Sequence, residues 1–133
     1  MSKFCKIQVY TGSRAEYGLL RNLIRRIESE KSFILKLVVT GSHLSPEYGN
    51  TIEEIKKDGI KIDKRIEMLI NTNSKIGITK SIGLSLLSLA EYLEESSPDL
   101  VILLGDRYEI LPVAIGALIS SIPVAHIHGG ELT

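Results

Sequence analysis

Charged and glycine residues follow two apolar runs near the end of the chain, and their types suggest acid–base chemistry. The run Leu100 to Leu104 ends at Gly105 to Arg107, and the run Ile122 to Ile127 ends at His128 to Glu131. Both runs are typical of buried parallel strands. Ligands of open α/β sheets bind beyond the carboxyl ends of the strands. The two strand ends therefore predict the floor of a polar site.

The histidines of the chain fall at predicted carboxyl strand ends. His126 and His128 alternate along the last predicted strand, so both side chains are expected on one face. Together with Asp106 and Glu131 they form an H-x-H-plus-carboxylate pattern that suits zinc or iron. Each also has a structural interpretation, His126 as a hydrogen-bonded core residue and His128 as a polar strand end. His43 follows another predicted strand on the same side, and this clustering favours a functional site.

The first predicted strand-to-helix turn, Thr11 to Gly18, has the features of an anion site. Free backbone N–H groups at the start of a helix attract anions, and Arg14 could add a bidentate contact to a phosphate. The glycine spacing is not that of a dinucleotide-binding fingerprint. An alternative interpretation is a capping box between Ser13 and Glu16, with Arg14 in solvent.

Strand-like and helix-like segments alternate along the whole chain. This alternation predicts an α/β fold with a doubly wound, Rossmann-like parallel sheet. The strands are expected at residues 7–11, 33–40, 62–66, 100–104 and 122–127. A helix is expected over residues 14–29, with Leu20, Leu23, Ile24 and Ile27 on one face, and a short helix after Asn50 should end at Gly59. A long third helix should bury Ile78, Ile82, Leu86, Leu89 and Leu93.

Pro112 constrains the start of the fourth predicted helix. If Asp106 were the helix cap, Pro112 would lie in the second turn and remove a hydrogen bond at a cost of about 3 kcal/mol. We therefore expect the helix to begin near Ile110 and to leave Gly105 to Arg107 in an open turn. Its buried face is expected to comprise Leu111, Ala114, Ile115 and Leu118.

Composition limits the classes of partner. The 133 residues suit one domain, and sixteen basic residues balance sixteen acidic ones, so no basic stripe for nucleic acid is expected. No uninterrupted apolar run approaches the roughly 20 residues of a membrane span, and no membrane partner is expected. A single cysteine, Cys5, suits the reducing cytoplasm and is expected to be a packing residue.

Four segments together resemble one enzyme family. They are Thr11 to Leu19, Thr40 to Ile55, Leu104 to Ile110 and Ala125 to Thr133. In sequence, order and spacing they are similar to the hydrolysing UDP-N-acetylglucosamine 2-epimerases of sialic-acid biosynthesis. The resemblance implies a two-domain fold like that of B-type glycosyltransferases, in which residues 1–133 form most of the N-terminal domain. The second domain, which holds much of the UDP in this family, is absent from the chain.

The resemblance also implies a reaction. UDP-N-acetylglucosamine and water give N-acetylmannosamine and UDP through anti elimination and a 2-acetamidoglucal, with no cofactor or metal. Asp106 matches the family's carboxylate, to which we assign general acid/base work at the sugar. Arg14 and Arg107 match residues on the nucleotide side, and Gly18 belongs to the first motif, which is expected to bind substrate.

The sugar side of the implied site has one departure from the family. His43 and His126 lie in motifs that line the sugar pocket. Many relatives carry a second catalytic Glu where this chain has His128. Either His128 or Glu131 is expected to supply the second proton transfer, since a histidine titrates near pH 6.5.

Three alternatives remain open at this stage. The same mechanism could act on UDP-N,N'-diacetylbacillosamine in the legionaminic acid pathway. A metal hydrolase could use His126, His128 and Asp106, and a non-catalytic module could bind nucleotide-sugars. In each epimerase interpretation the isolated chain is expected to fold, to be inactive, and to form a homo-oligomer through apolar surface on its cleft face.

Overall fold

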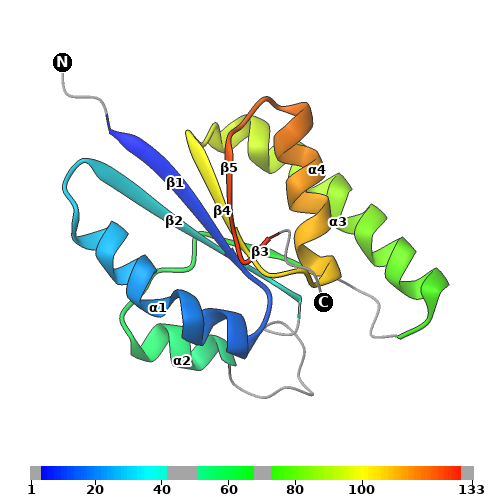
Figure 1. Ribbon diagram of the computed structural model, residues 1–133, viewed down its shortest axis with the longest axis horizontal. Helices are drawn as coiled ribbons and strands as arrows, with labels where there is room; N and C mark the ends of the chain where they lie inside the picture. Colours follow the sequence, from blue (N-terminus) through cyan, green and yellow to red (C-terminus); the bar gives the residue numbers. More distant parts are fainter. Residues whose placement is uncertain (1–3, 42–50, 68–72, 130–133) are drawn as a thin grey trace.

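Strands and helices alternate from the first described residues to the last (Figure 1). The structure is a computed structural model, and it describes residues 4–41, 51–67 and 73–129. Its strands are β1 (Cys5–Thr11), β2 (Phe33–Thr40), β3 (Lys64–Ile66), β4 (Leu100–Leu104) and β5 (Val124–Ile127). Its helices are α1 (Arg14–Ser29), α2 (Thr51–Lys57), α3 (Lys75–Ser96), the short 3-10 helix η3 (Tyr108–Ile110) and α4 (Leu111–Ile119).

The strands form one parallel sheet in the order β3-β2-β1-β4-β5. The chain therefore moves outward from β1 through β2 to β3, and then returns to build β4 and β5 on the other side of β1. Such a reversal creates a switch point at the carboxyl edge, between β1 and β4, where open α/β sheets bind ligands. The predicted doubly wound Rossmann-like sheet is confirmed.

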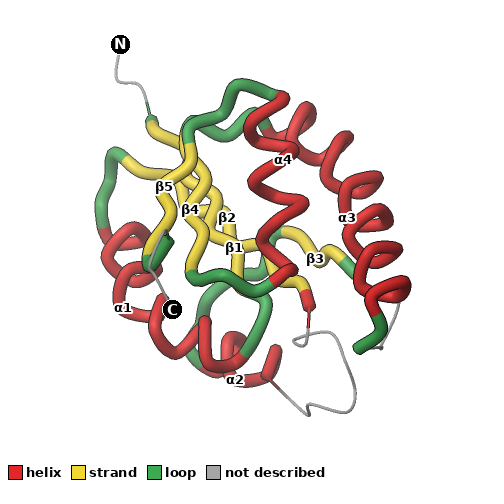
Figure 2. Tube along the Cα trace, turned by 45° about the vertical axis from the view of Figure 1, so that its right-hand side comes forward, coloured by secondary structure: helices red, strands yellow, loops and turns green. Residues whose placement is uncertain are grey.

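Helices cover both faces of the sheet (Figure 2). α1 and α2 lie on one face, and α3 and α4 lie on the other. Each face has its own apolar core, because side chains alternate along each central strand. Val9, Leu37 and Ile102 pack under α1 and α2, whereas Val38 and Leu103 pack under α3 and α4.

The start of α4 agrees with the prediction from Pro112, but the buried face does not. α4 begins at Leu111, with Pro112 in its first turn, where the missing N–H costs nothing. Its buried residues are Pro112, Val113 and Ala117, whereas Leu111 and Leu118 are 47% and 77% exposed. The sequence of α4 is apolar on every side, so periodicity could not identify the face that packs on α3.

The buried stripe of α3 was predicted correctly only in its second half. Leu89 and Leu93 are buried, but towards the N-terminus the buried residues are Gly77, Ser81 and Ser85. The predicted Ile78, Ile82 and Leu86 are half-buried. Small residues permit a close approach between elements. At Gly116 of α4 the two helices lie close together, since an added Cβ would lie 2.8 Å from Leu93 Cδ1.

Large apolar side chains are exposed on α3 and α4. Ile76 and Leu87 on α3 and Leu118 and Ile119 on α4 are at least 70% exposed. Among the described residues, α3 is long and apolar enough to cross a membrane by length and composition alone. Its C-terminal half is packed against the sheet through Leu89 and Leu93, as in the core helix of a folded domain.

β5 is an edge strand of the described sheet and is not fully buried. Val124 is 38% exposed, and Ala125 and Ile127 are only partly buried. The prediction of a fully buried strand was therefore wrong for β5. An apolar run does not reveal whether another strand follows it in the sheet.

Candidate active site at the carboxyl edge of the sheet

The two predicted strand ends lie side by side. β4 pairs with β5 so that Leu104 is opposite Ile127, and the Gly105 N–H donates to the Ile127 carbonyl at 2.9 Å. The segments that begin at Gly105 and at His128 therefore leave the sheet next to each other. Parallel register is what brings these two distant parts of the sequence to one edge.

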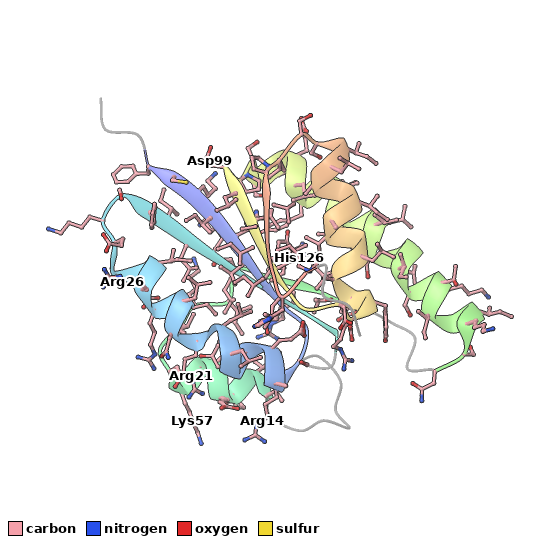
Figure 3. All side chains as sticks on the ribbon, in the orientation of Figure 1. Arg14, Arg21, Arg26, Lys57, Asp99 and His126 are labelled. Atoms are coloured by element: carbon pink, nitrogen blue, oxygen red, sulfur yellow. The ribbon has the colours of Figure 1, made fainter. Side chains whose placement is uncertain are left out.

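His126 is tied to the turn after β4 (Figure 3). Its Nε2 lies 2.6 Å from the Gly105 carbonyl oxygen. Because a carbonyl only accepts, Nε2 carries a proton and donates in this hydrogen bond. Gly129 folds over the ring, and a Cβ at that position would overlap the imidazole. The hydrogen-bonded histidine is confirmed, although the residue lies at an exposed edge rather than in the core.

His128 does not continue the strand. β5 ends at Ile127, and His128 adopts a left-handed backbone conformation with φ of 56°. Strand alternation therefore does not hold at His128, and the prediction that it shares a face with His126 on this basis was wrong. The sequence signal that predicts the end of the strand is the Gly129-Gly130 pair, because two successive glycines are typical of a turn.

Asp106 lies exposed in the open turn after β4, as expected from Pro112. It caps no helix, because Arg107 precedes η3 and Ile110 precedes α4. Within residues 4–41, 51–67 and 73–129 its carboxylate has no hydrogen bond or ion pair. A carboxylate in this position is accessible for proton transfer to a ligand.

Arg107 is held by a carboxylate that the sequence interpretation missed. Its Nη2 lies 2.8 Å from Glu109 Oε1, and its Nε lies 3.1 Å from Glu109 Oε2. This hydrogen bonding raises the pKa of Arg107, so the guanidinium stays charged. Glu109 is 2% exposed, whereas the Arg107 side chain is 52% exposed. In the sequence, the sole indication of this contact was that Glu109 carries the opposite charge two residues after Arg107.

Two glycines make room for Glu109 below the site. A Cβ on Gly12, after β1, would lie 3.4 Å from Glu109 Cβ. A Cβ on Gly41, after β2, would lie 3.0 Å from Glu109 Cγ and 2.7 Å from the Gly12 carbonyl oxygen. Gly41 also has a left-handed φ of 63°. The ends of β1, β2 and β4 therefore close around one buried carboxylate.

Glu16 is a second buried carboxylate in the same cluster, with 7% exposure. Burial raises its pKa, and the nearby Glu109 raises it further, against the lowering effect of the Ser13 hydroxyl. Ser13 is the N-cap of α1, and its Oγ accepts from the Glu16 N–H at 3.2 Å. The predicted capping interaction between Ser13 and Glu16 is thus present.

Arg14 and Gly18 are not in contact with the residues after β4 and β5. The Arg14 side chain is 76% exposed and its Nε lies 3.1 Å from Glu54 of α2. Figure 3 shows it pointing outward from the start of α1. Gly18 lies on an exposed part of α1, where an added Cβ would meet nothing within 4 Å. The solvated alternative for Arg14 therefore agrees with the structure.

His43 and Glu131 lie outside the described residues, so the structure neither adds them to the site nor removes them. Among the residues that the structure does describe, no three His, Cys, Asp or Glu side chains are grouped closely enough to hold a metal ion. The described site consists of Asp106, Arg107 and His126, with Glu109 and Glu16 below them.

Comparison with known proteins gives a consistent family. The sequence model described as UDP-N-acetylglucosamine 2-epimerase matches residues 25–133. The chain is 44% identical over 128 residues to a Campylobacter jejuni GDP/UDP-N,N'-diacetylbacillosamine 2-epimerase (hydrolyzing). It is also 44% identical over 128 residues to the Escherichia coli polysialic acid biosynthesis protein P7. Each of these matches covers 96% of the chain.

A solved structure agrees with the sequence relatives. The UDP-N-acetylglucosamine 2-epimerase of Neisseria meningitidis, bound to UDP-N-acetylglucosamine, has a TM-score of 0.78 and 25% identity. That match covers 96% of the chain and 33% of the Neisseria protein. The chain likewise spans about a third, 33%, of the Campylobacter and Escherichia relatives.

Proposed function

Because the chain belongs to the UDP-N-acetylglucosamine 2-epimerase family, we propose that it forms the N-terminal Rossmann-like domain of a hydrolysing nucleotide-sugar 2-epimerase. The overall reaction converts a UDP-2-acetamido sugar and water into UDP and the free sugar with inverted C2. The observation that carries the proposal is the grouping of Asp106, Arg107 and His126 where β4 and β5 end, at the carboxyl edge of the sheet beside the switch point. The bound UDP-N-acetylglucosamine of the Neisseria relative supports a UDP-sugar as the ligand.

The proposed mechanism has two stages. A base removes the C2 proton while the C1–O bond to UDP breaks in anti geometry, and the product is a 2-acetamidoglucal. Water then adds at C1, and a proton is delivered to C2 on the opposite face. Two proton-transfer groups must therefore flank the sugar ring. Asp106 is the first, because its carboxylate is exposed and without a partner among the described residues.

The second proton-transfer group is His128 or Glu131. His128 begins the turn beside the Asp106 segment, since β4 and β5 end in register. Its left-handed backbone turns the chain away from the strand at this point. His126 is assigned to the sugar side from β5, with its Nε2 fixed by the Gly105 carbonyl.

The departing diphosphate needs positive charge. Arg107 supplies it, because its guanidinium is half exposed and stays protonated beside Glu109. A charge-assisted hydrogen bond to a phosphate oxygen stabilises the leaving group in the transition state. Arg14, which is paired with Glu54, is the weaker candidate for this role.

The identity of the sugar is a choice between two substrates. Two relatives at 44% identity, from Campylobacter jejuni and Legionella pneumophila, are named for diacetylbacillosamine, and a third at 44% is named for polysialic acid biosynthesis. The relative named UDP-N-acetylglucosamine 2-epimerase, from Neisseria meningitidis, is 33% identical, so identity gives more support to diacetylbacillosamine. We propose that UDP-N-acetylglucosamine and UDP-N,N'-diacetylbacillosamine are assayed side by side.

The chain on its own is proposed to be inactive, because a half-site buries too little of a nucleotide-sugar to hold it tightly. We also propose self-association through exposed apolar surface of the cleft face, to which exposed side chains of α3 and α4 can contribute. Light scattering of the purified chain at high micromolar concentration tests this, and a clean monomer contradicts it. The single cysteine and the nucleotide-sugar substrate support a cytoplasmic location.

The test uses this chain fused to the remaining two thirds of the Campylobacter relative. The fusion should release UDP from one of the two sugars, and in D₂O the product should carry deuterium at C2. Asp106→Asn should lower the rate by roughly 10²–10⁴-fold with little change in substrate binding. Asp99→Asn is the matched control, because Asp99 lies at the opposite edge of the sheet, where it accepts from the Lys6 N–H at 2.7 Å (Figure 3).

Two further variants assign the second group. If His128 transfers the proton, His128→Gln lowers turnover severely and Glu131→Gln is mild. If Glu131 does so, Glu131→Gln is severe and His128→Gln is mild. Full activity in Asp106→Asn would refute the proposed site, and a fusion that binds UDP-sugars without turnover would favour a non-catalytic binding module.

A further inference from the structure

We propose that Glu109 is a positioning residue for Arg107, and that it holds the guanidinium at the carboxyl edge of the sheet to receive the diphosphate of the nucleotide-sugar. Glu109 itself is buried and does not reach the ligand. The inference rests on the proposed function, because it assigns the diphosphate to Arg107.

The contacts fix one side of the guanidinium and leave the other accessible. Nε and Nη2 of Arg107 both bond to the Glu109 carboxylate, at 3.1 Å and 2.8 Å. Nη1 lies outside this pair, and 52% of the side chain is exposed. A planar guanidinium held along one edge presents its remaining donors in one fixed direction, which suits a bidentate anion such as a phosphate.

The position of Glu109 is itself set by the backbone of three strand ends. Its Cβ and Cγ lie against Gly12 after β1 and Gly41 after β2. Its own segment, η3, continues directly into α4 and follows β4 by three residues, Gly105 to Arg107. Displacement of the Arg107 guanidinium from this position would therefore require movement of the strand ends, and not only of a surface side chain.

The electrostatics of the cluster favour a functional role over a purely structural one. Glu109 faces a second buried carboxylate, Glu16, and the two carboxylates share the charge of Arg107. Burying the carboxylates of Glu16 and Glu109 beside the half-exposed guanidinium of Arg107 is costly, because desolvation and mutual repulsion oppose it. Such a cluster is therefore an unfavourable way to stabilise η3. Buried ionisable groups with specific charge partners, at an edge of the sheet where ligands bind, are characteristic of functional sites.

Arg14 offers a contrast at the same edge. Its partner Glu54 is 32% exposed, and Arg14 itself is 76% exposed. An ion pair between solvent-exposed side chains is screened and holds neither partner in a single geometry. Of the two arginines near the carboxyl edge, only Arg107 is preorganised by a buried carboxylate.

The experiment measures UDP binding, and turnover of the UDP-sugar, in the fusion protein described above. The variants are Arg107→Gln, Glu109→Gln and the double variant, and uridine is the ligand without phosphates. Asp63→Asn is the control, because Asp63 is also a largely buried carboxylate, at 11% exposure, but precedes β3 at the amino edge. All variants are checked for folding by circular dichroism.

We expect Arg107→Gln to weaken UDP binding about 10- to 100-fold, as for loss of a hydrogen bond to a charged group, and to leave uridine binding unchanged. Glu109→Gln should weaken UDP binding by at least fivefold, and the double variant should bind UDP no more weakly than Arg107→Gln. Asp63→Asn should bind UDP within twofold of the parent. Glu109→Asp, which retracts the charge by one methylene, replaces Glu109→Gln if the latter fails to fold, with the same expected loss.

Three results would overturn the assignment. One is unchanged UDP affinity in the folded Glu109 variant, and another is additive losses in the double variant, because Glu109 would then act independently of Arg107. The third is unchanged UDP affinity in Arg107→Gln while the fusion still turns over its UDP-sugar. This third result overturns the inference but leaves the proposed function standing. If the parent fusion binds UDP but does not turn over either UDP-sugar, the proposed function is wrong, and UDP binding still tests the link between Arg107 and Glu109.

Discussion

Replacement of Gly41 by Ala is expected to destabilise the protein more than the same change at Gly59. Both glycines have left-handed backbones, with φ of 63° and 74°. A residue with a Cβ pays about 1–2 kcal/mol in that conformation. At Gly59, where a Cβ would meet nothing within 4 Å, this strain is the whole expected loss in the free energy of unfolding.

At Gly41 a steric cost is added. A Cβ there would lie 2.7 Å from the Gly12 carbonyl oxygen and 3.0 Å from Glu109 Cγ. The first contact is with backbone and cannot be relieved by a side-chain rotation. Overpacking of this kind costs about 1–3 kcal/mol. We therefore expect Gly41→Ala to lower the free energy of unfolding by about 2–5 kcal/mol, a large part of the 5–15 kcal/mol typical of a domain.

Urea denaturation of the parent, Gly41→Ala and Gly59→Ala measures both values under the same conditions. The midpoint should fall furthest for Gly41→Ala, with unchanged m, since neither change alters the surface exposed on unfolding. In the fusion protein, only Gly41→Ala should also weaken UDP binding, because it displaces Glu109. Equal destabilisation by the two variants would refute the reasoning, since it would mean that the strand ends do not close around Glu109.

The remaining predictions concern His126 and Glu16. Gly129→Ala should displace the His126 ring from the Gly105 carbonyl, because a Cβ at 129 overlaps the imidazole; the ring ¹⁵N shifts report the lost hydrogen bond, and unchanged shifts would contradict the contact. The raised pKa of Glu16 means that its contribution to stability is full below its ordinary value of 4.5 and is lost as pH rises through the folded pKa. Glu16→Gln should therefore raise Tm relative to the parent at pH 7 but not at pH 4. The same Tm difference at both pH values would show that the charged form of Glu16 does not destabilise the folded protein.

Much of the fold was predictable from local signals. The ranges of α1, β2 and β4 agree with their predicted ranges, because caps and uninterrupted apolar runs are properties of neighbouring residues. Pro112 correctly predicted the start of α4. The grouping of Asp106 with His126 followed from the sheet type alone, since parallel strands bring their carboxyl ends to one edge.

The buried faces of the helices on the α3–α4 side were not predictable in the same way. α4 is apolar on every side, and its orientation depends on α3. In α3, Ser81 and Ser85 are buried where periodicity favoured Ile82 and Leu86. Small residues are buried there because two elements approach closely, and the sequence of one helix does not contain the shape of its neighbour.

By itself, the sequence determined the order of the elements, the parallel sheet and the residues that follow each strand. Local backbone preferences set the elements, and alternating strands and helices are joined by crossovers into a parallel sheet. Only the tertiary structure decided that Arg14 pairs with Glu54 and that Glu109 is buried beneath Arg107. Those outcomes depend on contacts between segments far apart in the chain. The sequence around Glu109 is the same whether its carboxylate is exposed to water or buried between the ends of β1, β2 and β4. Burial of Glu109 is therefore decided only by the packing of those three segments.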